Sequence, residues 1–168
     1  MRLNLKDIIE IPGASVPFEC ELGTDALDFP SIKQYVSLPH AEGIVKNEAG
    51  VLHLTGTLTA DMLCICDRCG SEFPSTKVTV LDATIVEDDE GADPELFLLE
   101  GDEIDLDDML TTLFVLDMET KFLCEPDCKG LCPSCGKNLN LGPCNCRKQL
   151  DPRFAVLEQL LDKDPDGK

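Results

Sequence analysis

The chain has 168 residues, of which 43% are hydrophobic, and this length predicts one domain or one domain with a small appended module. Aspartate and glutamate number 33 against 14 lysine and arginine residues, so the formal net charge is −19. Such an acidic chain is not a conventional binder of duplex nucleic acid, because phosphate contacts need a basic surface. No signal-peptide core and no apolar stretch of membrane-spanning length occurs, so we expect no membrane partner and a cytoplasmic location.

The first half of the chain has the alternating pattern of β-strands. Apolar and polar residues alternate at residues 3–5 and 16–22, and a hairpin turn is predicted at residues 46–50. A long strand is predicted over residues 52–64 and a return strand over about 73–86. Gly56 is the one position on the apolar face of the long strand without a side chain, which predicts a bulge or a bend there. The pattern therefore predicts an antiparallel β-sheet or a partly open barrel.

The charge is concentrated in residues 82–108, which contain thirteen acidic residues and no lysine or arginine. Within this segment, residues 87–94 are predicted to form a mobile loop, and Asp105 is predicted to cap a short helix that reaches Phe114. A second short helix is predicted to begin at Asp151 and Pro152. The expected fold class is α+β, with an antiparallel β domain, acidic loop and helix in residues 1–120. Residues 121–168 are expected to form a cysteine-rich zinc module with a C-terminal helix.

Ten cysteines in a chain without a predicted export signal favour metal ligation over disulfide bonds. Two Cys-x-x-Cys-Gly stretches begin at Cys66 and Cys132. This spacing is typical of a zinc knuckle, because two thiolates on a tight turn can reach one ion and glycine accepts the positive φ at its end. The predicted zinc ligands are Cys132, Cys135, Cys144, Cys146, Cys66, Cys69, Cys124 and Cys128.

A closed structural zinc site takes four ligands, and this number constrains how the cysteines pair. The second knuckle forms one predicted site with Cys144 and Cys146 across a short loop. The first knuckle then needs two more ligands, and Cys124 and Cys128 are left to supply them. One or two structural zinc ions are therefore predicted, although a different pairing within residues 124–135 stays open. The remaining Cys20 and Cys64 lie on the apolar faces of predicted strands.

Catalysis is not indicated by these residues. A zinc ion closed by four thiolates has no open coordination position, and no nucleophile, base and orienting group occur in a recognisable arrangement. His40 and His53 are interpreted as ordinary loop and strand residues. We therefore predict that the protein is not an enzyme and has no small-molecule substrate.

The C-terminal cysteine pattern resembles a known family. Residues 123–146, LCEPDCKGLCPSCGKNLNLGPCNC, and the DPRFA that begins at residue 151 resemble the C-terminus of the YceD family, the large ribosomal RNA subunit accumulation proteins. The first knuckle after a long strand, and the acidic stretch before a helix, are similar to the same family's middle segment. The resemblance implies a bacterial ribosome-biogenesis factor needed for accumulation of 23S rRNA and assembly of the large subunit.

Two partners fit this resemblance, the 23S rRNA precursor and a basic large-subunit ribosomal protein. The candidate RNA-binding residues lie in a locally basic segment and are Lys121, Lys129, Lys137, Arg147, Lys148 and Arg153. The acidic segment at residues 82–108 would repel phosphate and attract a tail rich in lysine and arginine, so charge favours the protein partner. The alternative function is a redox-sensing, zinc-dependent chaperone, in which oxidation of the thiolates ejects zinc and unfolds the module.

Overall fold

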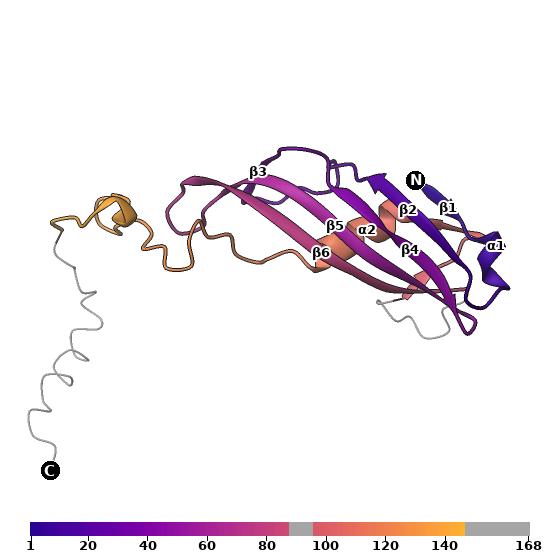
Figure 1. Ribbon diagram of the computed structural model, residues 1–168. Helices are drawn as coiled ribbons and strands as arrows, with labels where there is room; N and C mark the ends of the chain where they lie inside the picture. The colour runs from indigo at the N-terminus through magenta and orange to yellow at the C-terminus, as the bar shows by residue number, and fades with distance from the viewer. Residues whose placement is uncertain (88–95, 147–168) are drawn as a thin grey trace, which may run out of the picture.

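The computed structural model describes residues 1–87 and 96–146, and its main feature is an open six-stranded β-sheet (Figure 1). The elements are, in chain order, β1 (Arg2–Asn4), α1 (Lys6–Ile9), β2 (Ser15–Glu21), β3 (Ile32–Tyr35), β4 (His40–Glu48), β5 (Val51–Ile65), β6 (Glu72–Val86), β7 (Leu96–Leu98), β8 (Glu103–Asp105), α2 (Leu106–Leu116) and the 3-10 helix η1 (Leu139–Leu141). The predicted sheet of the first half is confirmed, and it is open rather than closed into a barrel.

The strands of this sheet lie in the order β2-β4-β5-β6-β7, and β3 pairs with the part of β5 that extends beyond β4. All pairs are antiparallel except β6 and β7, which run parallel. β1 and β8 form a separate antiparallel pair. The turn between β4 and β5 is shorter than predicted, because Ala49 and Gly50 alone make it with φ of 57° and 98°. Positive φ at both turn residues matches the twist of the flanking strands.

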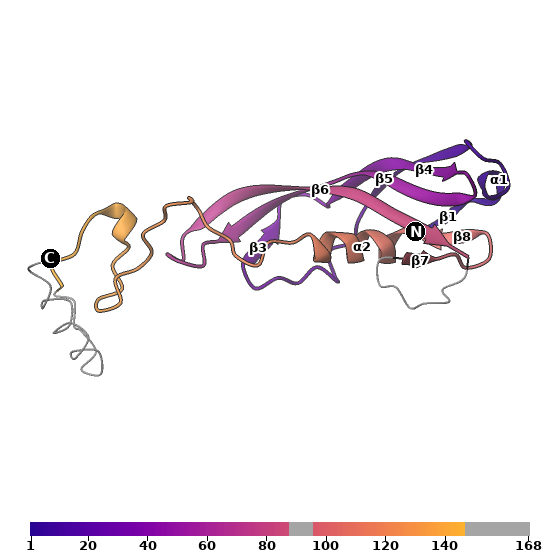
Figure 2. The same ribbon diagram turned by 90° about the horizontal axis from the view of Figure 1, so that it is seen from below.

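The core lies between the sheet and α2, which runs beneath the strands in Figure 2. Alternate residues of β5 face this core, so its burial follows the period of two that the sequence predicts. The predicted helix is confirmed, and the Asp105 side chain caps it by accepting hydrogen bonds from the backbone N–H groups of Asp107 and Asp108. Its fully buried residues are Leu106, Met109, Leu110 and Phe114.

Gly56 does not mark a bulge, so that part of the prediction is wrong. The register is continuous through it, with Gly43 of β4 opposite on one side and Leu81 of β6 on the other. A Cβ atom on Gly43 would overlap the carbonyl oxygen of Thr55 and lie 2.8 Å from Phe18 Cζ. The two facing glycines let the strands approach closely, and the Phe18 ring fills the space that their side chains leave.

Other elements were not predicted, namely α1, β3, β7, β8 and η1. The predicted helix from Asp151 lies outside the described residues, as does most of the predicted loop at residues 87–94. The division at residue 120 stays a prediction. None of the described helices is both long and apolar enough to cross a membrane.

Candidate metal centres

The two Cys-x-x-Cys-Gly stretches adopt the same backbone turn. In the first, the Gly70 N–H donates to the Cys66 carbonyl at 2.8 Å, and φ of Gly70 is 68°. In the second, the Gly136 N–H donates to the Cys132 carbonyl at 2.9 Å, and φ of Gly136 is 72°. The shared spacing therefore encodes a shared turn, and glycine sits where a side chain would strain the backbone.

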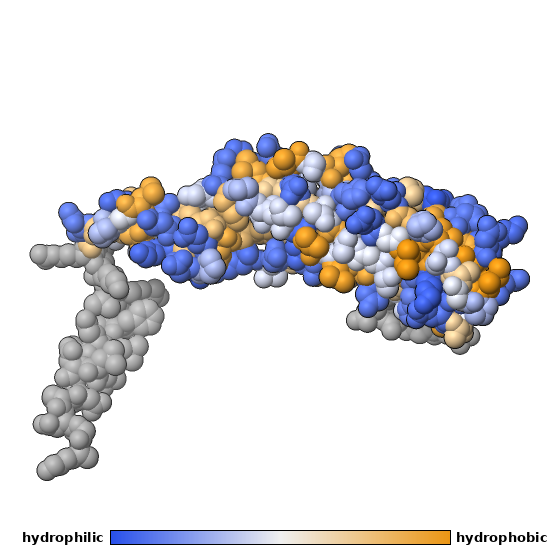
Figure 3. Space-filling model, viewed as in Figure 1, coloured by the Kyte–Doolittle hydropathy of each residue, from blue (hydrophilic) through white to orange (hydrophobic). Residues whose placement is uncertain are grey.

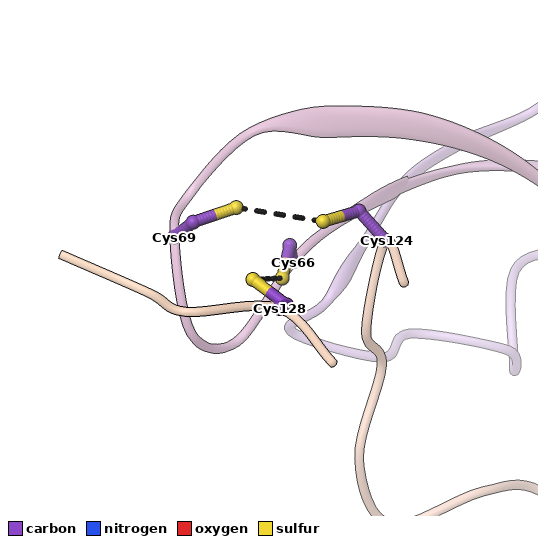
Figure 4. Close-up of side chains that lie close together, drawn as sticks. All are labelled: Cys66, Cys69, Cys124 and Cys128. Carbon is purple, nitrogen blue, oxygen red and sulfur yellow. Dashed lines mark hydrogen bonds between the residues drawn. The ribbon is translucent and has the colours of Figure 1, made fainter. Parts of the chain in front are cut away.

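The first cluster joins the turn between β5 and β6 to the chain that follows α2 (Figure 4). The Sγ atoms of Cys66 and Cys128 lie 3.7 Å apart, and those of Cys69 and Cys124 lie 3.6 Å apart. Sulfur atoms at the corners of a tetrahedral zinc site with Zn–S bonds of about 2.3 Å are about 3.8 Å apart. The geometry fits one zinc ion and is too long for a disulfide bond, which measures about 2.05 Å.

The second cluster contains Cys132, Cys135, Cys144 and Cys146, whose Sγ atoms all lie within 4.8 Å of one another. The same limit holds in the first cluster. The structure therefore brings the eight predicted cysteines into the two groups of four that ligand counting favoured, rather than into a group within residues 124–135. Cys20 and Cys64 lie outside both groups, as predicted, and pack in or against the core of the sheet.

Thiol electrostatics suit a divalent cation in both clusters. Burial by itself raises the pKa of Cys66, but backbone N–H groups at Cys124, Cys69 and Arg68 outweigh it and lower the pKa to about 6. Burial and the neighbouring thiols raise the pKa of Cys124 to about 12. Backbone amides thus stabilise the thiolate of Cys66, whereas Cys124 resists ionisation because negative charge already lies beside it. A bound cation would relieve the repulsion between the two thiolates.

The second cluster repeats this arrangement. Backbone N–H groups at Cys135 and Ser134, together with Cys144, lower the pKa of Cys132 to about 6. The hydrogen bond to Cys135 raises the pKa of Cys146 to about 12, and burial contributes as the second cause. The clusters differ in exposure, because Cys135 and Cys146 are exposed whereas three cysteines of the first cluster are buried. Oxidants in solution therefore reach the second cluster more easily.

Two side chains other than cysteine hold the first cluster together, and the sequence did not reveal their role. The Phe122 N–H donates to Asp67 Oδ2 at 2.6 Å, and the Asp67 N–H donates back to the Phe122 carbonyl at 2.9 Å. Arg68 Nη1 donates to the Cys128 carbonyl at 3.0 Å. Asp67 and Arg68 are the two residues inside the first knuckle, so their position in the motif was the signal available.

Asn140, just after the second knuckle, reaches back to the first cluster. Its Nδ2 donates to Cys128 Sγ at 3.2 Å, and its Oδ1 accepts from the Lys129 N–H at 2.7 Å. Asn138 caps the short helix η1 and also donates to Ser71 Oγ at 3.2 Å. Both asparagines lie between the ligand pairs of the second cluster, and they contact Cys128 of the first cluster and Ser71 beside it. Hydrogen bonds therefore connect the segments that carry the two clusters.

The candidate RNA-binding residues are only partly placed by the structure. Lys121, Lys129 and Lys137 are exposed, and Lys137 Nζ donates to the Pro143 carbonyl at 2.9 Å. Arg147, Lys148 and Arg153 lie outside the described residues.

Comparison with known protein families matches residues 54–161 to the family described as large ribosomal RNA subunit accumulation protein YceD. The chain belongs to the YceD family. The range shared with other YceD proteins contains both four-cysteine clusters. The YceD family is thus connected by name with accumulation of the large ribosomal RNA subunit. No solved structure shows a significant match to the chain.

Individual relatives agree with membership of the YceD family. An uncharacterized protein of Mycobacterium tuberculosis is 32% identical over 122 residues, which cover 70% of this chain and 58% of the relative. The uncharacterized protein YlbN of Bacillus subtilis is 28% identical over 118 residues, or 66% of this chain and 67% of the relative. The chloroplastic large ribosomal RNA subunit accumulation protein YCED homolog 1 of Arabidopsis thaliana is 34% identical over 65 residues, which cover 38% of this chain and 20% of the relative. The chain thus spans 58% of the length of its mycobacterial relatives.

Proposed function

We propose that this YceD protein is a non-enzymatic factor for 23S rRNA accumulation and large-subunit assembly, and that it binds a basic ribosomal protein directly. The family name supports the ribosomal role. The two cysteine clusters support a structural use of zinc, because four closely packed thiolates leave no open coordination position for a substrate. Each zinc ion would fix the chain that surrounds it.

The distribution of charge along the chain favours a basic protein over RNA as the direct partner. Residues 1–120 contain twenty-six aspartates and glutamates against six lysines and arginines, whereas residues 121–168 contain seven against eight. The β-sheet body is therefore strongly acidic, which repels RNA phosphates and accelerates encounters with a polypeptide rich in lysine and arginine. Acidic side chains also gather where β8 meets α2, at Glu100, Asp102, Glu103, Asp107 and Asp108.

Direct binding of the 23S rRNA precursor is the weaker alternative. Lys121, Lys129 and Lys137 offer exposed cations in the cysteine-rich segment. A zinc ion held by four thiolates carries a net charge of about −2, so two filled clusters offset these lysines. The local excess of positive charge is therefore small.

A crosslinking pull-down, with RNA and protein identified separately, tests the proposal. We expect basic large-subunit proteins among the crosslinked partners, with affinities that fall as salt concentration rises. Affinity for purified 23S precursor fragments should then be measured at two salt concentrations. Tight RNA binding whose log–log salt slope approaches about −4, the value for six contacts to single-stranded RNA, would contradict the proposal if no protein partner is found.

The redox-sensing chaperone is a second candidate, favoured by the exposure of Cys135 and Cys146. Peroxide treatment followed by measurement of released zinc and of aggregation of a denatured client protein separates the two functions. An assembly factor should show no gain of holdase activity when zinc is released. Strong, peroxide-dependent suppression of aggregation would instead support the chaperone.

A further inference from the structure

The outer face of the sheet, which points away from α2, is not covered by any described element (Figures 1 and 2). The strand registers align its side chains in four cross-strand rows of four residues, from β2 through β4 and β5 to β6. The row next to the β4–β5 turn is Ser15–Lys46–His53–Thr84, and its Lys46 is paired with Glu48 at 2.9 Å. The other three rows are Pro17–Ile44–Thr55–Asp82, Glu19–Glu42–Thr57–Val80 and Glu21–His40–Thr59–Val78. We refer to these twelve residues as the outer face.

Apolar residues lie in two separate parts of the outer face, Pro17 and Ile44 on β2 and β4 and Val78 and Val80 on β6. Val80 is 75% exposed and Val78 is 54% exposed, although both occupy the middle of a fifteen-residue strand. Ile44 is 40% exposed and borders a hollow of about 670 Å³ that it shares with Pro17 and Thr57. The space-filling view shows apolar residues set among polar ones over this face (Figure 3). Exposed β-branched residues, one of which lines a hollow, are typical of a surface that a partner covers.

Acidic residues gather on the β2–β4 part of the outer face, and its twelve residues include no lysine or arginine. Glu19 and Glu42 are directly opposite each other on β2 and β4, and both line the hollow. Like charges in this cross-strand position are destabilising. The three rows contain four carboxylates and no lysine or arginine, and only His40 comes near one of them, at 3.6 Å from Glu19. The repulsion is retained within the fold and would be relieved by a cation from outside.

We infer that the outer face is the docking surface for a basic amphipathic segment of the partner protein, an inference that rests on the proposed function. Aliphatic side chains of that segment would cover Val78 and Val80, and its lysine or arginine residues would meet Glu19 and Glu42. Strand spacing of about 4.8 Å puts the ends of a row about 14 Å apart, which a helix of about ten residues spans. Apolar contact distinguishes this site from the surface at β8 and α2, where Arg2 and the N-terminal amine already pair with Glu100 and Asp107.

Affinity measurements with designed peptides test this inference. The probes are an eighteen-residue helical peptide with one leucine face and one lysine face, a peptide of equal charge with serine replacing leucine, and an eighteen-residue oligouridylate. We expect the leucine–lysine peptide to bind the wild-type protein at least about tenfold more tightly than the serine–lysine peptide. The oligouridylate should show no measurable binding.

Two double variants locate the binding site. Glu19→Gln with Glu42→Gln should weaken the leucine–lysine peptide about two- to tenfold, because two exposed ion pairs are lost. Val78→Thr with Val80→Thr should weaken it about threefold while keeping the β-branched shape. The matched control is Asp102→Asn with Asp108→Asn, which removes the same charge near β8 and α2 and should change the affinity less than twofold.

Thermal unfolding separates lost binding from lost folding. The glutamine variant removes a cross-strand repulsion, so it should be at least as stable as the wild type while it binds more weakly. Unchanged affinity in both outer-face variants, with a loss in the control, would place the partner on the β8–α2 surface and overturn this inference alone. A wild-type protein that binds neither the peptides nor basic large-subunit proteins would remove the proposed function as well.

Discussion

Replacing Cys69 by serine should release the C-terminal cysteine-rich segment from the sheet, if one zinc ion joins both sides of the first cluster. The Cys69–Cys124 contact links positions 55 residues apart. A cross-link that closes a loop of this size stabilises the folded state by about 4 kcal/mol through the entropy of the unfolded chain. That value corresponds to about a thousandfold change in the opening equilibrium. The hydrogen bonds around Asp67 and Arg68 would remain, at about 1 kcal/mol each.

Hydrogen exchange combined with native mass spectrometry measures this effect. Cys69→Ser should reduce the zinc content from two ions to one and accelerate exchange in residues 121–132 by up to about a thousandfold. Cys20→Ser is the matched control, because Cys20 lies outside both clusters and should leave zinc and exchange unchanged. Cys135→Ser should remove the other ion and change exchange in the β5–β6 turn much less than Cys69→Ser does, because Cys66 and Cys69 keep their own ion. Unaltered exchange in residues 121–132 of Cys69→Ser, at one zinc per chain, would refute the shared site.

Three further predictions follow from particular contacts. Gly56→Ala should lower the free energy of unfolding by about 1–3 kcal/mol in a urea titration, because its Cβ would overlap the Glu42 carbonyl, whereas Gly23→Ala, with open space around it, should cost little. Asn140→Ala should weaken zinc binding at the first cluster by about tenfold in a chelator competition, since Cys128 loses its hydrogen-bond donor. Hydrogen bonds from Ser31 and the Phe122 N–H lower the pKa of Asp67, so the stability they contribute should be lost as pH falls from the unfolded value of about 3.9 toward the lower folded value. Asp67→Asn should flatten that part of the stability–pH curve.

Local chemistry explains what the sequence predicted well. The Cys-x-x-Cys-Gly stretches form the expected turns because a glycine with positive φ is specified within the motif itself. Strand β5 and helix α2 were predicted from local sequence in the same way, since alternating burial on β5 and the Asp105 cap depend on residues close together in the chain. Counting ligands in fours identified the two four-cysteine clusters because the coordination number of zinc, rather than the fold, sets that number.

Elements that depend on distant residues were missed. Helix α1 has only four residues, and Asn47 Nδ2 supports it from β4 by donating to the carbonyls of Ile8 and Ile9 at 2.8 and 2.7 Å. Strand β7 has three residues and exists as a parallel neighbour of β6. Gly56 was predicted to mark a bulge or a bend because the sequence does not show that Gly43 lies opposite it, which only the strand register reveals. Each case needs tertiary information that periodicity does not contain.

The pairing of β1 with β8 has a consequence for the order in which the protein folds during synthesis. Arg2 pairs with Asp105, so the first strand emerges from the ribosome about a hundred residues before its partner exists. The hairpins β4–β5 and β5–β6 can form early, because their contacts are local in sequence. Their apolar face then has no helix to cover it until α2 is made, and Cys66 has no second pair of ligands until Cys128 follows. A nascent chain that ends near residue 100 is therefore the species most exposed to aggregation and to premature thiol oxidation.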